Sequence, residues 1–264
     1  MNQKIELLEE ILQEQTFVNN PVNTLRDIDN LKIIVWTFSK TGTSTLASSF
    51  QHSIDGTTQY KNVIHCHDET CWFHNISPKL KEIDFTFDLL IEYINSKGIK
   101  PLVIHSYRPP FQRVLSEIFH FVSRNGRDIS ISNDDTFINP ALVNYYKNTF
   151  KDIWTHDFDK QRGFGFHVGD TYDILYTTIN AIDNLPENIQ SIKQLKEYHD
   201  LKIQSKNRAD SHTDYENIKS MVKWSEERVN KLYEIHKEPL SFFYNNHDIS
   251  VMKDNDLKKH SRGK

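Results

Sequence analysis

Cysteine is scarce in this chain, with only 2 among 264 residues. Two cysteines cannot build the disulfide framework of a small secreted domain, so a reducing compartment is the expected location. No apolar run approaches the ~20 residues that a membrane-spanning helix needs. The first residues, Met1 to Glu6, lack the pattern of a signal peptide. We therefore expect a cytoplasmic protein without a membrane span.

An excess of positive charge is also missing. The chain has 32 Lys and Arg residues against 36 Asp and Glu residues, a formal net charge of −4. It carries no basic stripe apart from a short segment at Lys258 to Lys264. Nucleic acid is therefore not an expected partner. A heavily sulfated polymer is also disfavoured, because binding it would need a long basic groove.

The length of the chain suits a single α/β domain with a sizeable core. Short apolar runs at 32–37, 62–66 and 101–106 are separated by helical stretches. This alternation predicts a central, mainly parallel sheet flanked by helices. We expect one domain over residues 1–245, followed by a polar, flexible C-terminal tail at 246–264.

Other segments complete the expected layout. Residues 3–15 have apolar positions at helical spacing and predict an amphipathic helix. A second helix is expected over residues 85–95, ending near Gly98, and a later strand over residues 172–179. In sheets of this kind, ligands bind at the carboxyl ends of the strands. We therefore expect the functional site there.

The segment from Leu31 to Leu46 joins a β-branched run to a turn rich in hydroxyl groups. A strand, a tight turn and a helix start together favour phosphate binding, because backbone N–H groups and the helix dipole face the anion. Lys40 would add a full positive charge beside Gly42. The hydroxyl donors in this turn are Ser39, Thr41, Thr43, Ser44 and Thr45.

The residue order in this turn differs from that of nucleoside-triphosphate enzymes. Their motif, G-x-x-x-x-G-K-[ST], places the lysine after the second glycine. Here Lys40 precedes Gly42, and no other glycine stands nearby. The order K-x-G-T-x-x instead resembles the 5′-phosphosulfate loop of sulfotransferases, which use 3′-phosphoadenosine-5′-phosphosulfate (PAPS) as donor.

A second strand, turn and helix pattern occupies residues 99–122. A proline pair suits the turn and the first helical position. Arg108 stands at the strand exit, and Arg113 and Ser116 are three residues apart on one helix face. The pattern R-x-P-x-x-R-x-x-S is similar to the 3′-phosphate-binding motif of sulfotransferases. A guanidinium and a hydroxyl group suit a phosphate dianion.

Together, the two motifs resemble the PAPS-dependent sulfotransferase family, in particular bacterial carbohydrate and capsular-polysaccharide sulfotransferases. The resemblance extends in weaker form over residues 30–245. It implies a P-loop-like sulfotransferase fold and transfer of a sulfuryl group from PAPS to an acceptor hydroxyl on a glycan or a small compound. The products would include adenosine 3′,5′-bisphosphate, and no metal would be required. Lys40 would neutralise charge on the leaving phosphate, and Lys206 and Arg208 are further candidates for donor binding.

The general base is expected in the stretch from Val63 to His74, which follows the second strand. A neutral histidine suits the removal of the acceptor's proton, because its pKa lies near the working pH. His67 is the first candidate, with His65 and Glu69 as alternatives. In contrast, His105 stands outside both motifs and is expected to be a hydrogen-bonded histidine of the core or its rim.

Other interpretations remain open. Cysteine and histidine are zinc ligands, and the same stretch contains Cys66, His67, Cys71 and His74. Ordinary packing at the edge of a cleft would also explain this cluster. A nucleotide or small-molecule kinase with an atypical phosphate loop would need acids that hold Mg²⁺, for which Asp68 and Glu69 are the local candidates. The last alternative is a non-catalytic protein that binds a nucleotide or zinc.

Overall fold

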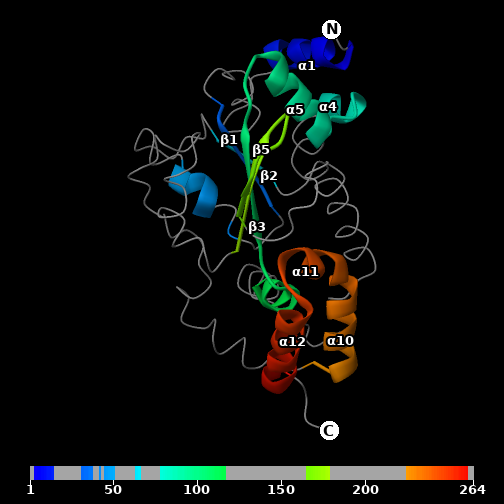
Figure 1. The fold of residues 1–264 in the computed structure, drawn as a ribbon. Coiled ribbons are helices and arrows are strands. Elements are labelled where there is room, and N and C mark those ends of the chain that lie inside the picture. The colour runs from blue at the N-terminus through cyan, green and yellow to red at the C-terminus, as the bar shows by residue number, and fades with distance from the viewer. Residues whose placement is uncertain are drawn as a thin grey trace. The chain divides into compact units, whose positions relative to one another are not determined.

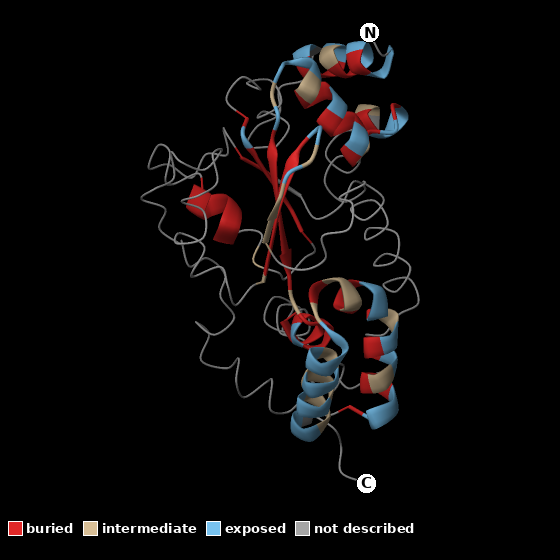
Figure 2. Cartoon of the chain, in the orientation of Figure 1, coloured by how far each residue is buried: buried red, intermediate tan, exposed pale blue. Residues whose placement is uncertain are grey.

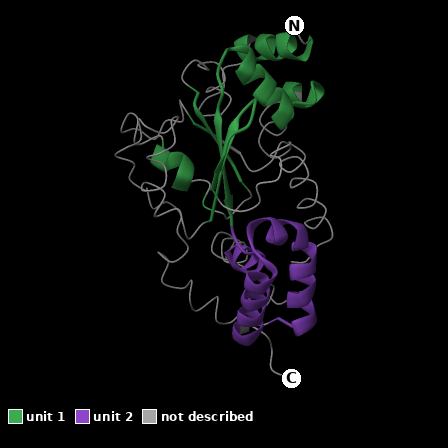
Figure 3. Cartoon of the chain, viewed as in Figure 1, with its two compact units in different colours: residues 1–107, 164–206 green, residues 108–163, 207–264 purple. Residues whose placement is uncertain are grey.

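The computed structural model describes residues 3–14, 31–37, 42, 45–50, 63–66, 78–116, 165–178 and 224–260. The chain divides into two compact units, residues 1–107 with 164–206, and residues 108–163 with 207–264 (Figure 3). The expectation of a single domain over residues 1–245 stays a prediction. Among the described helices, none has the length and apolar character needed to cross a bilayer.

The first unit is built on a 5-stranded sheet with the strand order β2-β1-β3-β5-β4 (Figure 1). The strands are β1 (Ile33–Trp36), β2 (Val63–Cys66), β3 (Leu102–Tyr107), β4 (Gly165–His167) and β5 (Asp173–Thr178). Strands β2, β1, β3 and β5 run parallel, and β4 pairs antiparallel with β5. The prediction of an α/β protein with a mainly parallel sheet is confirmed.

Every residue of β1 and β3 is buried (Figure 2), as expected for parallel strands covered on both faces. Residues 45–50 form a helical segment on one face, where Leu46, Ala47 and Phe50 join the apolar cluster of the sheet. Helix α5 (Phe87–Ser96) packs against the sheet through Phe87, whose ring meets the ring of Trp36 edge to face at 4.6 Å.

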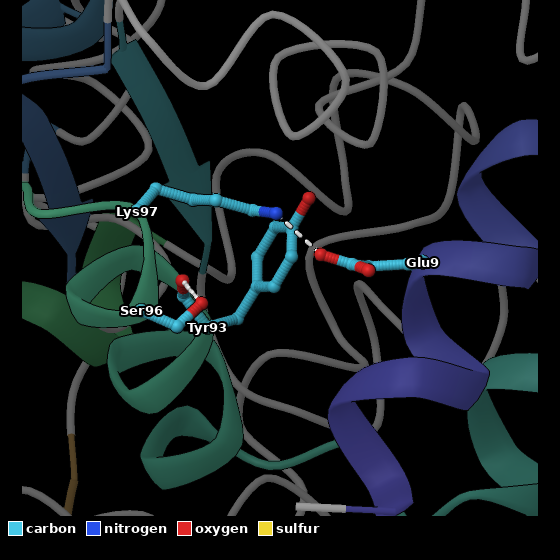
Figure 4. A network of polar contacts seen from close by, with 4 residues as sticks. All are labelled: Glu9, Tyr93, Ser96 and Lys97. Carbon is cyan, nitrogen blue, oxygen red and sulfur yellow. Dashed lines mark hydrogen bonds and ion pairs between the residues drawn. The ribbon is translucent and has the colours of Figure 1, made fainter. Parts of the chain in front are cut away.

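Helix α5 has a defined start and is linked to the N-terminal helix α1 (Gln3–Glu14). The N-cap residue Thr86 accepts a 3.2 Å hydrogen bond from the N–H of Leu89, which satisfies one donor of the first turn. At the other end, Lys97 forms an ion pair with Glu9 and lies 5.4 Å from the ring centroid of Tyr93 (Figure 4).

Helix α1 agrees with the apolar spacing in the sequence. The apolar residues expected on one side of α1 are all buried: Ile5, Leu8, Ile11 and Leu12. The short helix α4 (Pro78–Glu82) precedes α5. The amphipathic pattern of residues 3–15 is therefore confirmed as a helix with its apolar face inward.

The second unit is helical in its described part. It contains residues 110–116, α10 (Glu226–Ile235), α11 (Lys237–Phe243) and α12 (Asn246–His260). Helix α12 occupies residues for which the sequence predicts a polar, flexible tail from residue 246, and the flexibility of this segment stays a prediction. The segment is polar and has no clear apolar stripe, so periodicity could not reveal it. The Asn245 side chain caps its start by accepting a 2.9 Å hydrogen bond from the N–H of Asp248.

Candidate functional site

The first phosphate motif begins at the carboxyl end of β1, whose last residue is Trp36. Further along, Gly42 has a φ of +92°, a backbone conformation that residues with a Cβ atom rarely adopt. The Gly42 carbonyl accepts a 2.9 Å hydrogen bond from the N–H of Leu46. Thr45 is the first helical residue after this turn and is buried. The expected strand and helix start are therefore present on either side of the motif.

Several predicted site residues lie outside the described part of the chain. From the first motif these are Ser39, Lys40, Thr41, Thr43 and Ser44. The others are the candidate bases His67 and Glu69 and the candidate donor contacts Lys206 and Arg208. The roles assigned to these residues stay predictions.

The second phosphate motif follows the carboxyl end of β3. Arg108 comes directly after Tyr107, the last residue of the strand, and is half-buried. The N–H of Arg113 donates a 3.0 Å hydrogen bond to the Pro109 carbonyl and so closes the first helical turn. Arg113 is 2% exposed and Ser116 is 7% exposed. The predicted helix is present, and its two motif side chains, Arg113 and Ser116, are buried.

Arg113 lies in a cationic and aromatic part of the second unit. Burial lowers the pKa of His236 to about 3, and the positive charge of Arg113 contributes to the same shift. The guanidinium of Arg228, also buried, lies 5.2 Å from the ring centroid of Trp224. That ring in turn meets Phe111 edge to face at 5.1 Å. A guanidinium over an aromatic face is a favourable cation–π arrangement.

The sequence motif singles out Arg113, whereas no ligand motif marks Arg228 or His236. The latter two residues lie in or next to α10, in a segment without a recognised ligand motif. The spacing W-x-x-x-R between Trp224 and Arg228 places the two residues about one helical turn apart. This spacing is the local pattern that could have indicated their contact. The proximity of His236 to Arg113 depends on how the helices pack, which the sequence pattern does not report.

The second strand positions the backbone of one candidate base. His65 pairs with Val35 in the parallel register between β1 and β2, one residue before the strands end at Trp36 and Cys66. His67 follows the carboxyl end of β2 directly. The stretch from Val63 to His74 therefore starts with a strand, β2, that ends at the carboxyl edge of the sheet, as expected. The identity of the base stays a prediction.

His105 lies inside the sheet, near the end of β1. Its Nδ1 atom is 2.8 Å from the Trp36 carbonyl oxygen, and because a carbonyl only accepts, Nδ1 donates its proton. Burial lowers the pKa of His105 to about 4, although the hydrogen bond to Trp36 acts in the opposite direction. The ring is thus neutral near pH 7, with its proton on Nδ1. The expectation of a hydrogen-bonded core histidine is confirmed.

Among the described side chains, no group of three or more His, Cys, Asp and Glu is placed to hold a metal ion. The zinc alternative rests on Cys66, His67, Cys71 and His74, whose side chains fall outside that part of the chain. The acids considered for Mg²⁺ in the kinase alternative, Asp68 and Glu69, also fall outside it.

The fold class of the chain is α/β, with a mainly parallel sheet flanked by helices. Comparison with protein-family models, with curated proteins and with solved structures finds no match for it. Membership of a particular family is therefore a proposal that rests on the sequence motifs and on their places in the fold.

Proposed function

We propose that this protein is a PAPS-dependent sulfotransferase with a P-loop-like sulfotransferase fold. The observation that carries the proposal is the position of the two motifs along the chain. One follows the carboxyl end of β1 and the other follows the carboxyl end of β3, and these two strands are parallel neighbours in the sheet. The carboxyl edge of an open parallel sheet is where such folds bind their ligands.

The proposal assigns the 5′-phosphosulfate of the donor to residues 39–45. The positive φ of Gly42 supports this assignment, because a glycine lets the backbone turn tightly and approach an anion closely. Lys40 would supply the positive charge, and the neighbouring hydroxyl groups would supply hydrogen-bond donors. Arg108 and Ser116 are assigned to the 3′-phosphate, with Arg113, Lys206 and Arg208 as further candidates for donor binding.

The proposed reaction moves a sulfuryl group to a hydroxyl, which we expect to lie on a glycan or a small compound. The acceptor oxygen attacks sulfur in line, and the bond from sulfur to the bridging phosphate oxygen breaks. A base, His67 or alternatively His65 or Glu69, takes the acceptor proton. Negative charge develops on the bridging oxygen of the leaving adenosine 3′,5′-bisphosphate, where Lys40 would stabilise it. Loss of one such donor typically costs ~3 kcal/mol of transition-state stabilisation.

Ligand-dependent thermal stability tests the proposal. Adenosine 3′,5′-bisphosphate at about 100 times its Kd should raise the free energy of unfolding by about 2.7 kcal/mol. Adenosine 5′-monophosphate is the matched control, because it lacks only the 3′-phosphate assigned to Arg108 and Ser116. Stabilisation by ATP with Mg²⁺ alone would indicate a kinase instead, and destabilisation by a chelator would indicate a zinc protein.

Turnover provides the second arm of the test. Sulfur-labelled PAPS is incubated with the protein and a panel of glycans and small hydroxyl compounds. The proposal expects label to pass to at least one acceptor without added divalent metal. Binding of the bisphosphate with no transfer to any acceptor would leave a nucleotide-binding protein and contradict the enzymatic part of the proposal.

A further inference from the structure

On its β3 side, the end of β1 is held by a side chain, whereas on its β2 side Trp36 stays in register with Cys66. Backbone pairing between β1 and β3 extends to Val35 and Ile104, whereas β3 itself continues to Tyr107. Trp36 and His105 are the next residues along each strand. There the His105 ring donates its Nδ1 proton to the Trp36 carbonyl over 2.8 Å. A side-chain hydrogen bond thus links the two strands one residue beyond their last backbone pair.

We propose that His105 is a positioning residue, which holds the last peptide group of β1 and so sets the direction in which the chain leaves the sheet toward Gly42. The consequence for nucleotide binding rests on the proposed function, whereas the structural part does not. His105 is fully buried. It would therefore act on the first phosphate motif through the backbone of β1, without touching a ligand.

Packing fixes the orientation of the His105 ring. In the register between β3 and β5, His105 pairs with Tyr176, and the two rings meet edge to face with centroids 5.8 Å apart. On its other side, the Tyr176 ring meets His167 of β4 at 5.6 Å. A buried ring packed in this way has few rotamers open to it. Together with this packing, the hydrogen bond keeps the Nδ1 atom at the Trp36 carbonyl.

Described hydrogen bonds lie on either side of residues 38–41. Before these residues, the Trp36 carbonyl is held by His105. At Gly42, the carbonyl is held by the N–H of Leu46, and the φ of +92° sets the turn. Lys40 lies between these two hydrogen bonds in the sequence. Loss of the first hydrogen bond is expected to change the approach of the chain to Gly42 and, through it, the affinity for the nucleotide.

Two substitutions separate the hydrogen bond from the packing. His105→Asn can place an amide donor where Nδ1–H lies, while His105→Leu fills similar space without a donor. His167→Leu is the matched control, because His167 also packs against Tyr176 but lies on β4. The first measurement is the backbone amide resonances of Thr37 and Gly42. We expect His105→Leu to shift both, His105→Asn to restore both, and His167→Leu to leave both unchanged.

The second measurement is the nitrogen resonances of the His105 ring in the unmodified protein. We expect a protonated Nδ1 and an unprotonated Nε2. Finding the proton on Nε2 would overturn the inference, because the bond to Trp36 could not then form. If His105→Leu does not fold, His105→Gln replaces it, since the glutamine amide reaches the Nε2 position instead. If neither variant folds, the inference is decided by the His105 tautomer measured in the unmodified protein.

The third measurement is the affinity for adenosine 3′,5′-bisphosphate. We expect His105→Leu to weaken binding by at least about tenfold, and His105→Asn to recover most of that loss. Failure of asparagine to restore both the resonances and the affinity would reduce His105 to a packing role. If the unmodified protein does not bind the bisphosphate, the proposed function fails, whereas the resonance measurements still decide the inference about His105.

Discussion

The hydroxyl of Tyr233 in α10 donates a 2.6 Å hydrogen bond to the carboxylate of Asp256 in α12, 23 residues further along the chain. The bond joins two helices of the second unit at a half-buried position. Because the described side chains of α12 are half-buried or exposed, we expect this bond to contribute substantially to the docking of α12 on α10.

Substitution of Tyr233 by phenylalanine tests that contribution. Tyr233→Phe keeps the ring but removes the donor, and should lower the free energy of unfolding by about 1–2 kcal/mol. Urea denaturation of this variant, of Asp256→Ala and of the double variant gives the coupling energy between the two side chains. Additive effects of the two substitutions would show that the bond is not a source of stability.

Buried His236 predicts sensitivity to acid. Burial, aided by Arg113, lowers the pKa of His236 from 6.5 to about 3. His236 therefore binds a proton near pH 6.5 in the unfolded chain, but only near pH 3 in the native protein. The free energy of unfolding should fall as the pH drops through this window, by up to about 1.4 kcal/mol per pH unit for this group.

The variant His236→Gln removes this titration. We expect a shallower loss of stability between pH 6.5 and pH 4 than in the unmodified protein, while the two stability profiles run parallel above pH 7. Urea denaturation at a series of pH values provides the measurement. An unchanged slope below pH 6.5 would mean that His236 is protonated in the folded protein.

The ion pair between Lys100 and Asp173 links the segment that leads into β3 with the first residue of β5. Lys100 Nζ lies 2.6 Å from Asp173 Oδ1, and the side chains are 38% and 3% exposed, respectively. Lys100→Met would remove the positive charge that pairs with the buried carboxylate of Asp173. Since solvent reaches the lysine, we expect a loss of about 1–2 kcal/mol rather than the larger cost of breaking a fully buried pair.

A second ion pair in the same unit serves as the control. Lys4 Nζ lies 3.8 Å from Asp84 Oδ2, and both side chains are well exposed. Lys4→Met should change the free energy of unfolding by less than about 0.5 kcal/mol. Equal effects of the two substitutions in denaturant titrations would show that the burial of Asp173 adds nothing to its pairing with Lys100.

Under the proposed function, Lys40→Ala should remove most of the turnover. Loss of the charge that stabilises the leaving phosphate is expected to lower kcat by about a hundredfold to a thousandfold, while the affinity for the bisphosphate falls less. Lys32→Ala is the control, because Lys32 is an exposed lysine on the same segment. Normal sulfuryl transfer by Lys40→Ala would remove Lys40 from the proposed mechanism.

Arg108→Ala should act mainly on donor binding. If Arg108 binds the 3′-phosphate, the affinity for adenosine 3′,5′-bisphosphate should fall by about 2 kcal/mol, in the range of hydrogen bonds to charged groups. The affinity for adenosine 5′-monophosphate should barely change. Calorimetric titration of both nucleotides measures the difference, and an equal loss for the two would contradict the assignment of Arg108 to the 3′-phosphate.

Local periodicity was sufficient to predict most of the first unit. The spacing of the apolar residues in α1 predicted its buried face, and short β-branched runs predicted β1, β2, β3 and β5. These signals work because a helix or a strand repeats its side-chain direction at a fixed interval. A sequence therefore reports which face of each element is buried before any partner is known.

Strand β4 and helix α12 are among the described elements that this reasoning did not predict. Strand β4 has only three residues, all half-buried, and it includes Gly165 with a φ of +133°. Such a segment carries no periodic signal, and it is a strand because β5 offers its backbone an edge to pair with. Helix α12 is polar over most of its surface, and its contact with α10 distinguishes it from the tail that its composition predicts.

The candidate site divides in the same way. The motif letters alone identified the two phosphate motifs, because ligand chemistry requires particular residue types at short spacings. The letters could not show that Arg113 is buried and lowers the pKa of His236, or that His105 holds the carbonyl of Trp36, 69 residues away. These contacts join residues that are distant in sequence, and no local pattern encodes them.

By itself, the sequence determined the fold class, the order of the parallel-strand segments along the chain and the chemical types available at the strand ends. Only the tertiary structure decided which strands are neighbours, which arginines are buried and which carbonyl His105 contacts. The physical reason is that element formation depends on nearby residues, whereas burial and hydrogen-bond partners depend on how the elements pack together.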